Sequence, residues 1–210
     1  MRVATFALDA CILLFIVGAA AAQDRMPPIP KDKITEAQKK ALDELTAGPR
    51  GAGGASGPFV PLLRSPEFMS VLQKTGEYVR FHNTIGPKLT EFVILLTARQ
   101  WTQQYEYDAH EPSALKAGVK QETISAITEG RRPAGMAPDE EVAYDFCTEL
   151  RQNQSVSDTT YARAVSKFGE QGVIDMTGLV GYYATLAMIM NVARSPIADG
   201  KKAPLAPFPH

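Results

Sequence analysis

The sequence predicts an all-α fold of about seven helices. Apolar residues recur at intervals of three and four along most of the chain. Few segments alternate apolar and polar residues with a period of two, and runs of β-branched residues are scarce, so strands are not expected. The chain has 210 residues, of which 45% are hydrophobic. That is enough to bury a core without disulfide or metal support.

The first predicted helix lies near the N-terminus. Thr35 and Gln38 have the spacing of a capping box, in which each side chain bonds the backbone of the other residue. This helix ends at Gly48-Pro49. The second predicted helix begins at Pro61, and its apolar spacing continues to Phe81.

A Gly86-Pro87 pair separates the second helix from a third, which we expect from Lys88 to His110. Glycine ends two of the later helices, and acidic residues favour the start of another because of the helix dipole. The last helix is almost uniformly apolar, so we expect it to be buried on most sides. These later helices are predicted over residues 121–130, 138–152, 157–168 and 170–193.

The N-terminal residues resemble a secretory signal peptide. Arg2 precedes a short apolar run, and Ala20 and Ala22 fit the cleavage site that would follow it. We therefore expect an exported protein, periplasmic or secreted, with no membrane segment after cleavage. The chain divides into a signal peptide at 1–22, an extension with one short helix and a glycine-rich loop at 23–60, a helical domain at 61–195, and an extended proline-rich tail at 196–210.

Composition excludes several classes of function. The 22 basic and 23 acidic residues give a net charge of -1, which argues against a nucleic-acid partner. The glycine-rich loop at 50–58 lacks the preceding strand and the Gly-Lys-Ser/Thr ending of a phosphate-binding loop. Cys11 lies in the predicted signal peptide, and Cys147 is expected on the buried face of a helix. The mature chain then has no internal disulfide.

One group of polar residues interrupts the apolar pattern. Gln103, Glu106 and His110 are spaced three and four apart, so they line one face of the predicted 88–110 helix. At about 100° per residue, Glu91 would lie within about 60° of the same face. A carboxylate orients a neighbouring imidazole and raises its pKa, and partial burial brings that pKa near neutrality, as acid/base catalysis requires.

Two other interpretations of this group stay open. The spacing also fits a solvated helix face with a structural His–Glu pair. Glu91, Glu106 and His110 could instead hold a metal ion, although one histidine with two glutamates is a sparse ligand set.

Three motifs resemble those of the carboxymuconolactone decarboxylase family, which includes alkylhydroperoxidase D-like proteins. They are Glu91-Phe-Val-Ile-Leu-Leu-Thr-Ala-Arg99, Tyr105-Glu-Tyr-Asp-Ala-His110, and Gly118-Val119 followed by Glu122-Thr-Ile124. The resemblance covers residues 61–195. It implies an alkylhydroperoxidase D-like helical bundle that assembles into homotrimers or homohexamers.

A departure from the family pattern indicates the branch. The peroxidase branch places a Cys-x-x-Cys pair between the glutamate and the histidine, where this sequence has Gln103 and Glu106. Thiol peroxidase chemistry needs a reactive thiolate and a resolving thiol. The resemblance therefore implies the branch without the thiol pair.

In the decarboxylase that the motifs resemble, a carboxylate leaves a carbon conjugated with an unsaturated lactone. The lactone carbonyl accepts the electrons, so no cofactor and no metal is needed. The resemblance implies that His110 is the acid/base and that Glu106 or Glu91 orients it. Candidate substrate-binding residues are Arg99, which could hold a carboxylate by a forked contact, Gln103, Tyr107, Tyr183 and His82.

The sequence thus supports a cofactor-free lyase or isomerase that acts on a small carboxylated or lactone-type molecule. Its partners would be this small molecule and other copies of the chain. An alternative is a non-enzymatic exported oligomer that binds a small molecule or a partner. A peroxidase is a second alternative, and the missing thiol pair argues against it.

Overall fold

The structure is a computed structural model that describes residues 24–51, 55–197 and 201–206. Within these residues the chain forms α-helices, one short 3₁₀-helix at Lys31–Lys33 and no strand, which confirms the all-α fold. The predicted signal peptide at 1–22 lies outside the described residues. The helices are α1 (Glu36–Ala47), α2 (Phe59–Leu62), α3 (Pro66–Phe81), α4 (Pro87–Gln100), α5 (Gln104–Lys116), α6 (Gln121–Thr128), α7 (Pro138–Asn153) and α8 (Asp158–Ala193).

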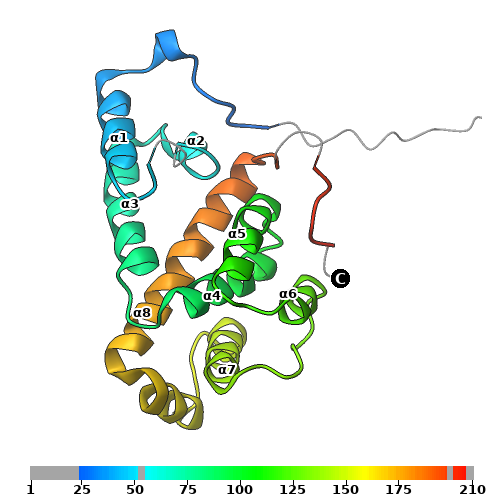
Figure 1. The fold of residues 1–210 in the computed structure, drawn as a ribbon. Helices are drawn as coiled ribbons and strands as arrows, with labels where there is room; N and C mark the ends of the chain where they lie inside the picture. Colours follow the sequence, from blue (N-terminus) through cyan, green and yellow to red (C-terminus); the bar gives the residue numbers. More distant parts are fainter. Residues whose placement is uncertain (1–23, 52–54, 198–200, 207–210) are drawn as a thin grey trace, which may run out of the picture.

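Helix α8 crosses the middle of the molecule and the other helices pack around it (Figure 1). It contacts α2 and α3 on one side and α4 and α7 on the other, while α1 packs along α3. Helix α4 also packs against α5, α6 and α7. Fully buried side chains from α4 and α8 join these layers, among them Phe92, Leu95, Met176 and Leu179. Each such side chain stabilises the fold by about 1.5–3 kcal/mol relative to exposure.

Side-chain caps start two of the helices. The Gln38 backbone N–H donates to Thr35 Oγ1 at 3.3 Å and the Thr35 N–H donates to Gln38 Oε1 at 3.0 Å, so the capping box is confirmed. Ser157 Oγ accepts from the Thr160 N–H and caps α8. These bonds satisfy N–H groups that have no partner within a helix.

The predicted 88–110 helix is wrong, because the chain breaks between α4 and α5. Thr102 adopts a left-handed backbone conformation with φ 46°, and Gln103 becomes the N-cap of α5. The Gln103 side-chain oxygen accepts the Glu106 N–H at 3.0 Å. Glu91 and Glu106 therefore lie on different helices, so Glu91 does not share a helical face with Glu106 and His110.

The predicted 61–81 helix is also divided, into α2 and α3. Pro66 opens α3, and proline forces the preceding Ser65 out of the helical region, where it has φ -128° and ψ 74°. The predicted boundary at Gly169 is present, with φ 70° and ψ 170°, as a kink within the continuous helix α8. Glycine adopts this combination of φ and ψ without strain because it has no Cβ, so Gly169 permits the change of direction.

The described part of the C-terminal tail packs against the domain. Leu205 is buried, its N–H donates to Gln104 Oε1 at 2.9 Å, and its carbonyl accepts from Gln104 Nε2 at 2.8 Å. Lys201 pairs with Asp108 at 2.7 Å. This extended segment therefore covers one side of α5.

In the described part of the chain, α8 alone is long and apolar enough to cross a membrane. Half of its most apolar window is buried inside the protein. The central helix of a globular domain has the same properties, and the packing of α8 against four other helices fits that interpretation.

Candidate active site

An imidazole–carboxylate pair joins α5 to α4. His110 and Glu91 are both buried, and His110 Nδ1 lies 2.6 Å from Glu91 Oε2. A carboxylate only accepts, so the ring donates its Nδ1–H and this bond fixes the orientation of the imidazole. The other oxygen of Glu91, Oε1, lies 3.5 Å from Arg80 Nη2 at the end of α3. The buried carboxylate thus links three helices.

The protonation of His110 differs from the sequence prediction. Burial lowers the pKa of the imidazole, Glu91 opposes this shift, and the positive charges of Arg80 and Arg50 add to it. The sequence predicts a pKa near neutrality from the opposing effects of the carboxylate and partial burial; the pKa is instead lowered, because removal from water outweighs the carboxylate. The neutral ring with its proton on Nδ1 carries a lone pair on Nε2. That atom has no hydrogen-bond partner among the described residues.

Glu106 lies one helical turn before His110 on α5, and its pKa shifts in the opposite direction. Its side chain is 3% exposed, and its Oε2 atom is buried without a hydrogen-bond partner. Burial raises the pKa of this carboxyl well above its ordinary value. Helix α5 therefore carries an imidazole that can accept a proton on Nε2 beside a carboxyl group that can donate one.

These groups border a cavity of about 340 Å³. Its wall comes from α5, α8, the end of α3, the start of α2, and the segment between α1 and α2. Arg50, Arg80, Glu106 and His110 are its titratable groups besides two tyrosines, and aromatic and apolar side chains complete the lining. A concave pocket in which several polar groups converge between apolar walls is a usual form of a small-molecule site.

The comparisons with known proteins agree with this fold. The sequence matches the family model described as "Carboxymuconolactone decarboxylase family" over residues 66–149. Residues 66–149 belong to this family. The segment spans α3 to α7 and so includes Arg80, Glu91 and His110. No curated protein matches the sequence.

A solved structure has a similar fold. The crystal structure of the debrominase Bmp8 in its apo form superposes with a TM-score of 0.62 and 12% sequence identity. The match covers 85% of this chain and 93% of that chain. At this identity the likeness establishes the fold alone.

The structure brings four of the predicted site residues together. His110, Glu106 and Tyr183 line the cavity, and Glu91 bonds His110 from behind. The Tyr183 ring meets the His110 ring edge to face, with centroids 5.2 Å apart at 89°. Tyr183 is almost fully buried, and burial raises the pKa of its hydroxyl, so the hydroxyl stays protonated.

Four other predicted residues lie away from this cavity. Gln103 caps α5 and donates from Nε2 to Asn191 at 3.2 Å. Tyr107 is fully buried, and its hydroxyl contacts Ile124 O at 3.1 Å and Thr128 Oγ1 at 2.7 Å. These contacts are structural, so neither side chain reaches a molecule in the cavity.

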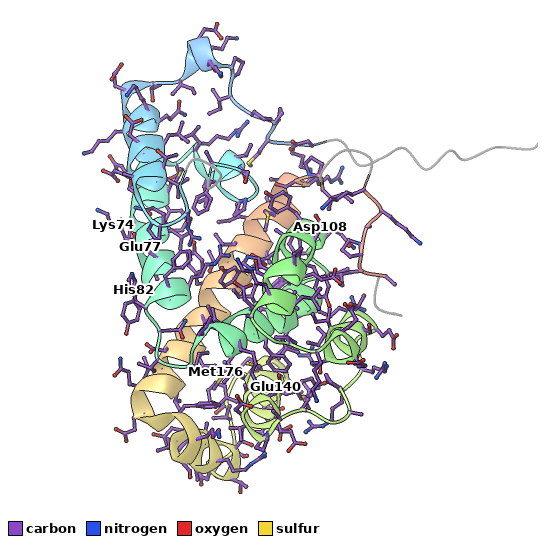
Figure 2. The ribbon with its side chains drawn as sticks, viewed as in Figure 1. Lys74, Glu77, His82, Asp108, Glu140 and Met176 are labelled. Carbon is purple, nitrogen blue, oxygen red and sulfur yellow. The ribbon has the colours of Figure 1, made fainter. Side chains whose placement is uncertain are left out.

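Arg99 and His82 are the other two. Arg99 donates to the Ala206 carbonyl at 2.9 Å and borders a separate cavity of about 40 Å³. His82 is exposed at the C-terminal end of α3, and Figure 2 shows it on the outer side of that helix. Arg99 and His82 therefore do not line the cavity that contains His110, and the predicted contacts of these two residues with substrate are not formed there.

Arg50 and Arg80 line the cavity although no sequence pattern predicts them there. Arg50 comes from the extension before the family segment, and Arg80 lies beside Phe81 at the end of α3. Neither residue belongs to a recognisable motif. Both reach the cavity through tertiary packing, which the spacing of residues in the sequence does not show. The signal available in the sequence is an arginine beside a run of glycines and an Arg-Phe-His sequence at a helix end.

Two further observations concern metal and thiol chemistry. In residues 24–51, 55–197 and 201–206, no three His, Cys, Asp or Glu side chains are placed to hold a metal ion. Cys147 is the free cysteine of this part of the chain, and burial raises the pKa of its thiol to about 12. Cys147 borders the 40 Å³ cavity and not the one that contains His110.

Proposed function

We propose that this protein, whose residues 66–149 match the carboxymuconolactone decarboxylase family, is a cofactor-free enzyme of the lyase or isomerase type. It moves a proton on a small carboxylated or lactone-type molecule held in the 340 Å³ cavity. One arrangement carries the proposal: at one cavity wall, Glu91 holds His110 through Nδ1 beside the buried, unpartnered carboxyl of Glu106. Burial lowers the pKa of the imidazole and raises that of the carboxyl.

The protonation states suggest a role for each group. In an isomerisation, His110 Nε2 removes a proton from a carbon next to a carbonyl, and the electron pair moves onto the carbonyl oxygen. Where a C=C bond is conjugated with that carbonyl, the Glu106 carboxyl then delivers a proton to the distant carbon of the resulting dienolate, and the double bond shifts. The imidazolium and the carboxylate that remain return to their starting states by exchanging a proton through water.

A decarboxylation uses the same groups. The bond between the carbon and its carboxylate breaks, CO₂ leaves, and the electron pair is delocalised onto the neighbouring carbonyl. The Glu106 carboxyl then donates the proton that replaces CO₂ on the carbon, and it regains a proton from water. Glu91 acts as a positioning residue, because it holds the Nδ1–H and keeps the lone pair on Nε2.

Thiol peroxidase activity has little support at this site. The Cys147 thiol is buried and lies outside the cavity, and a raised pKa removes the thiolate that peroxide chemistry requires. Export and assembly into a homotrimer or homohexamer stay part of the proposal. N-terminal sequencing of the exported protein and light scattering test them.

A screen in D₂O tests the proposed reaction. The protein is incubated with a panel of small lactones and carboxylic acids, and NMR follows deuterium incorporation and CO₂ release. We expect turnover by the wild type, loss of turnover in His110→Ala, and normal turnover in the control His82→Ala, because His82 is exposed and outside the cavity. Turnover that survives in folded His110→Ala would contradict the proposal. No turnover across the panel would favour the non-enzymatic binding protein.

A further inference from the structure

Two arginines share the cavity with His110 and have more hydrogen-bond donors than partners. Arg50 lies in the segment after α1 and donates from Nη2 to the Tyr182 hydroxyl at 3.1 Å. Its Nε atom is buried without a partner, and no acidic side chain pairs with it in the described part of the chain. A guanidinium has five donors, and a buried donor without a partner is costly. Arg50 is therefore prepared for an acceptor that the protein does not supply.

Arg80 is in a similar position. Its Nη2 atom makes a 3.5 Å ion pair with Glu91, and its Nε atom is buried without a hydrogen-bond partner. The same Glu91 carboxylate also accepts the 2.6 Å hydrogen bond from His110. The Glu91 carboxylate is thus shared between Arg80 and His110, and Arg80 keeps N–H donors that this carboxylate does not bind.

Aromatic stacking holds both guanidinium groups in place. The Arg50 Cζ atom lies 5.4 Å from the centroid of Phe59 and 5.6 Å from that of Phe81, and the Arg80 Cζ atom lies 5.1 Å from the Phe81 centroid. Stacked guanidinium groups keep their in-plane N–H donors available. Two like charges against one ring repel each other, and an anion between them would relieve this repulsion.

The backbone of α3 makes room for Arg50. A Cβ atom at Gly76 would lie 2.1 Å from the Tyr182 hydroxyl and 2.6 Å from Arg50 Nη2. Any larger residue at this position would displace the Arg50–Tyr182 pair. The absence of a side chain at Gly76 therefore fixes where Arg50 reaches the cavity.

The charges in the cavity favour an anionic ligand. Arg50 and Arg80 are both positive, while Glu106 keeps its proton and His110 is neutral. Glu91 is the single acidic partner that the ion pairs provide for these two arginines in the described residues. Arginine binds carboxylates by paired, charge-assisted hydrogen bonds.

We propose that Arg50 and Arg80 bind a free carboxylate group of the ligand, so that the cavity takes a small organic acid and rejects its uncharged ester. Arg50 is then a specificity-determining residue that the N-terminal extension adds to the family segment at 66–149. This inference rests on the proposed function for the role of the ligand as substrate, but its test is a binding measurement.

Calorimetric titration tests the inference with succinate, glutarate and adipate, each compared with its dimethyl ester. We expect the wild type to bind at least one of the diacids and to bind its ester much more weakly. Arg50→Gln should weaken binding of that diacid by about 10- to 100-fold, because charge-assisted hydrogen bonds are lost. The control Lys74→Gln removes one positive charge from an exposed position on the outer side of α3 (Figure 2) and should change the Kd by less than about twofold.

Circular dichroism and thermal unfolding confirm that each variant is folded. If Arg50→Gln does not fold, Arg50→Lys is the second variant, and it should also bind the diacid more weakly because lysine lacks the forked geometry. Equal affinity for acid and ester, no binding of any diacid, or a Kd that Arg50 substitution leaves unchanged would overturn the inference.

The titrations also separate this inference from the proposed function. Binding that survives Arg50 substitution, together with turnover that depends on His110, overturns the inference alone. Diacid binding that depends on Arg50 without proton transfer in the D₂O screen supports the inference and removes the proposed function.

Discussion

Replacing Glu106 with glutamine should make the protein progressively more stable than the wild type as the pH rises above 4.5. The side chain is 3% exposed, Oε2 has no partner, and burial raises its pKa. In the unfolded chain the carboxyl ionises near pH 4.5, whereas the folded protein keeps the proton. The contribution of the protonated Glu106 to the free energy of unfolding is therefore fully present below that pH. It is lost as the pH rises toward the folded-state pKa, by up to about 1.4 kcal/mol per pH unit.

Urea unfolding of both proteins at pH values from about 5 to about 7 measures this effect. Glutamine has nearly the same shape as glutamate and does not titrate in this range, so any cost of burying its amide is independent of pH. Titration of the other groups is common to both proteins and cancels in the difference. We expect the free energy of unfolding of Glu106→Gln, minus that of the wild type, to grow with pH. A difference that is flat or falls with pH would show that the folded protein holds Glu106 ionised, and would refute the reasoning.

Three further predictions concern other buried groups. Asp175 accepts three hydrogen bonds, so Asp175→Ala should lower the free energy of unfolding by about 2–4 kcal/mol in urea, whereas the exposed control Glu170→Ala should change it by less than about 0.5 kcal/mol. Tyr107→Phe should lower the free energy of unfolding by about 1–2 kcal/mol and leave diacid binding unchanged; weakened binding would place Tyr107 in the site. Cys147, in a chain that starts at residue 23, should react with a thiol reagent about 100-fold more slowly when folded than in urea, because burial raises its pKa to about 12; equal rates would contradict this burial.

Local chemistry explains the helix boundaries that the sequence predicts. The Thr35–Gln38 capping box and the glycine at 169 act through neighbouring residues, and the structure shows both. The break between α4 and α5 is different. Thr102 and Gln103 are neither glycine nor proline, and the break depends on a distant hydrogen bond from Gln103 to Asn191 as well as on the local cap. Sequence spacing alone does not contain that contact.

The candidate site likewise combines features set by neighbouring residues with features set by the packing of distant helices. Glu106 and His110 are one turn apart on one helix, so their proximity is predictable. Glu91 reaches His110 because α4 packs against α5, and Arg50 reaches the cavity because Gly76 leaves space for it. Both depend on how helices pack, which periodicity does not determine. The direction of the His110 pKa shift depends on burial for the same reason.

NMR of the imidazole nitrogens in ¹⁵N-histidine-labelled protein tests the account most directly. Comparison with His110→Ala assigns the His110 signals, and a pH titration follows them from neutral to acidic conditions. We expect Nδ1 protonated and Nε2 bare at neutral pH, with no second proton taken up as the pH falls through the ordinary histidine value of 6.5, because burial lowers the pKa. A proton on Nε2 with Nδ1 bare, or an imidazolium already present above pH 6.5, would contradict the proposed base.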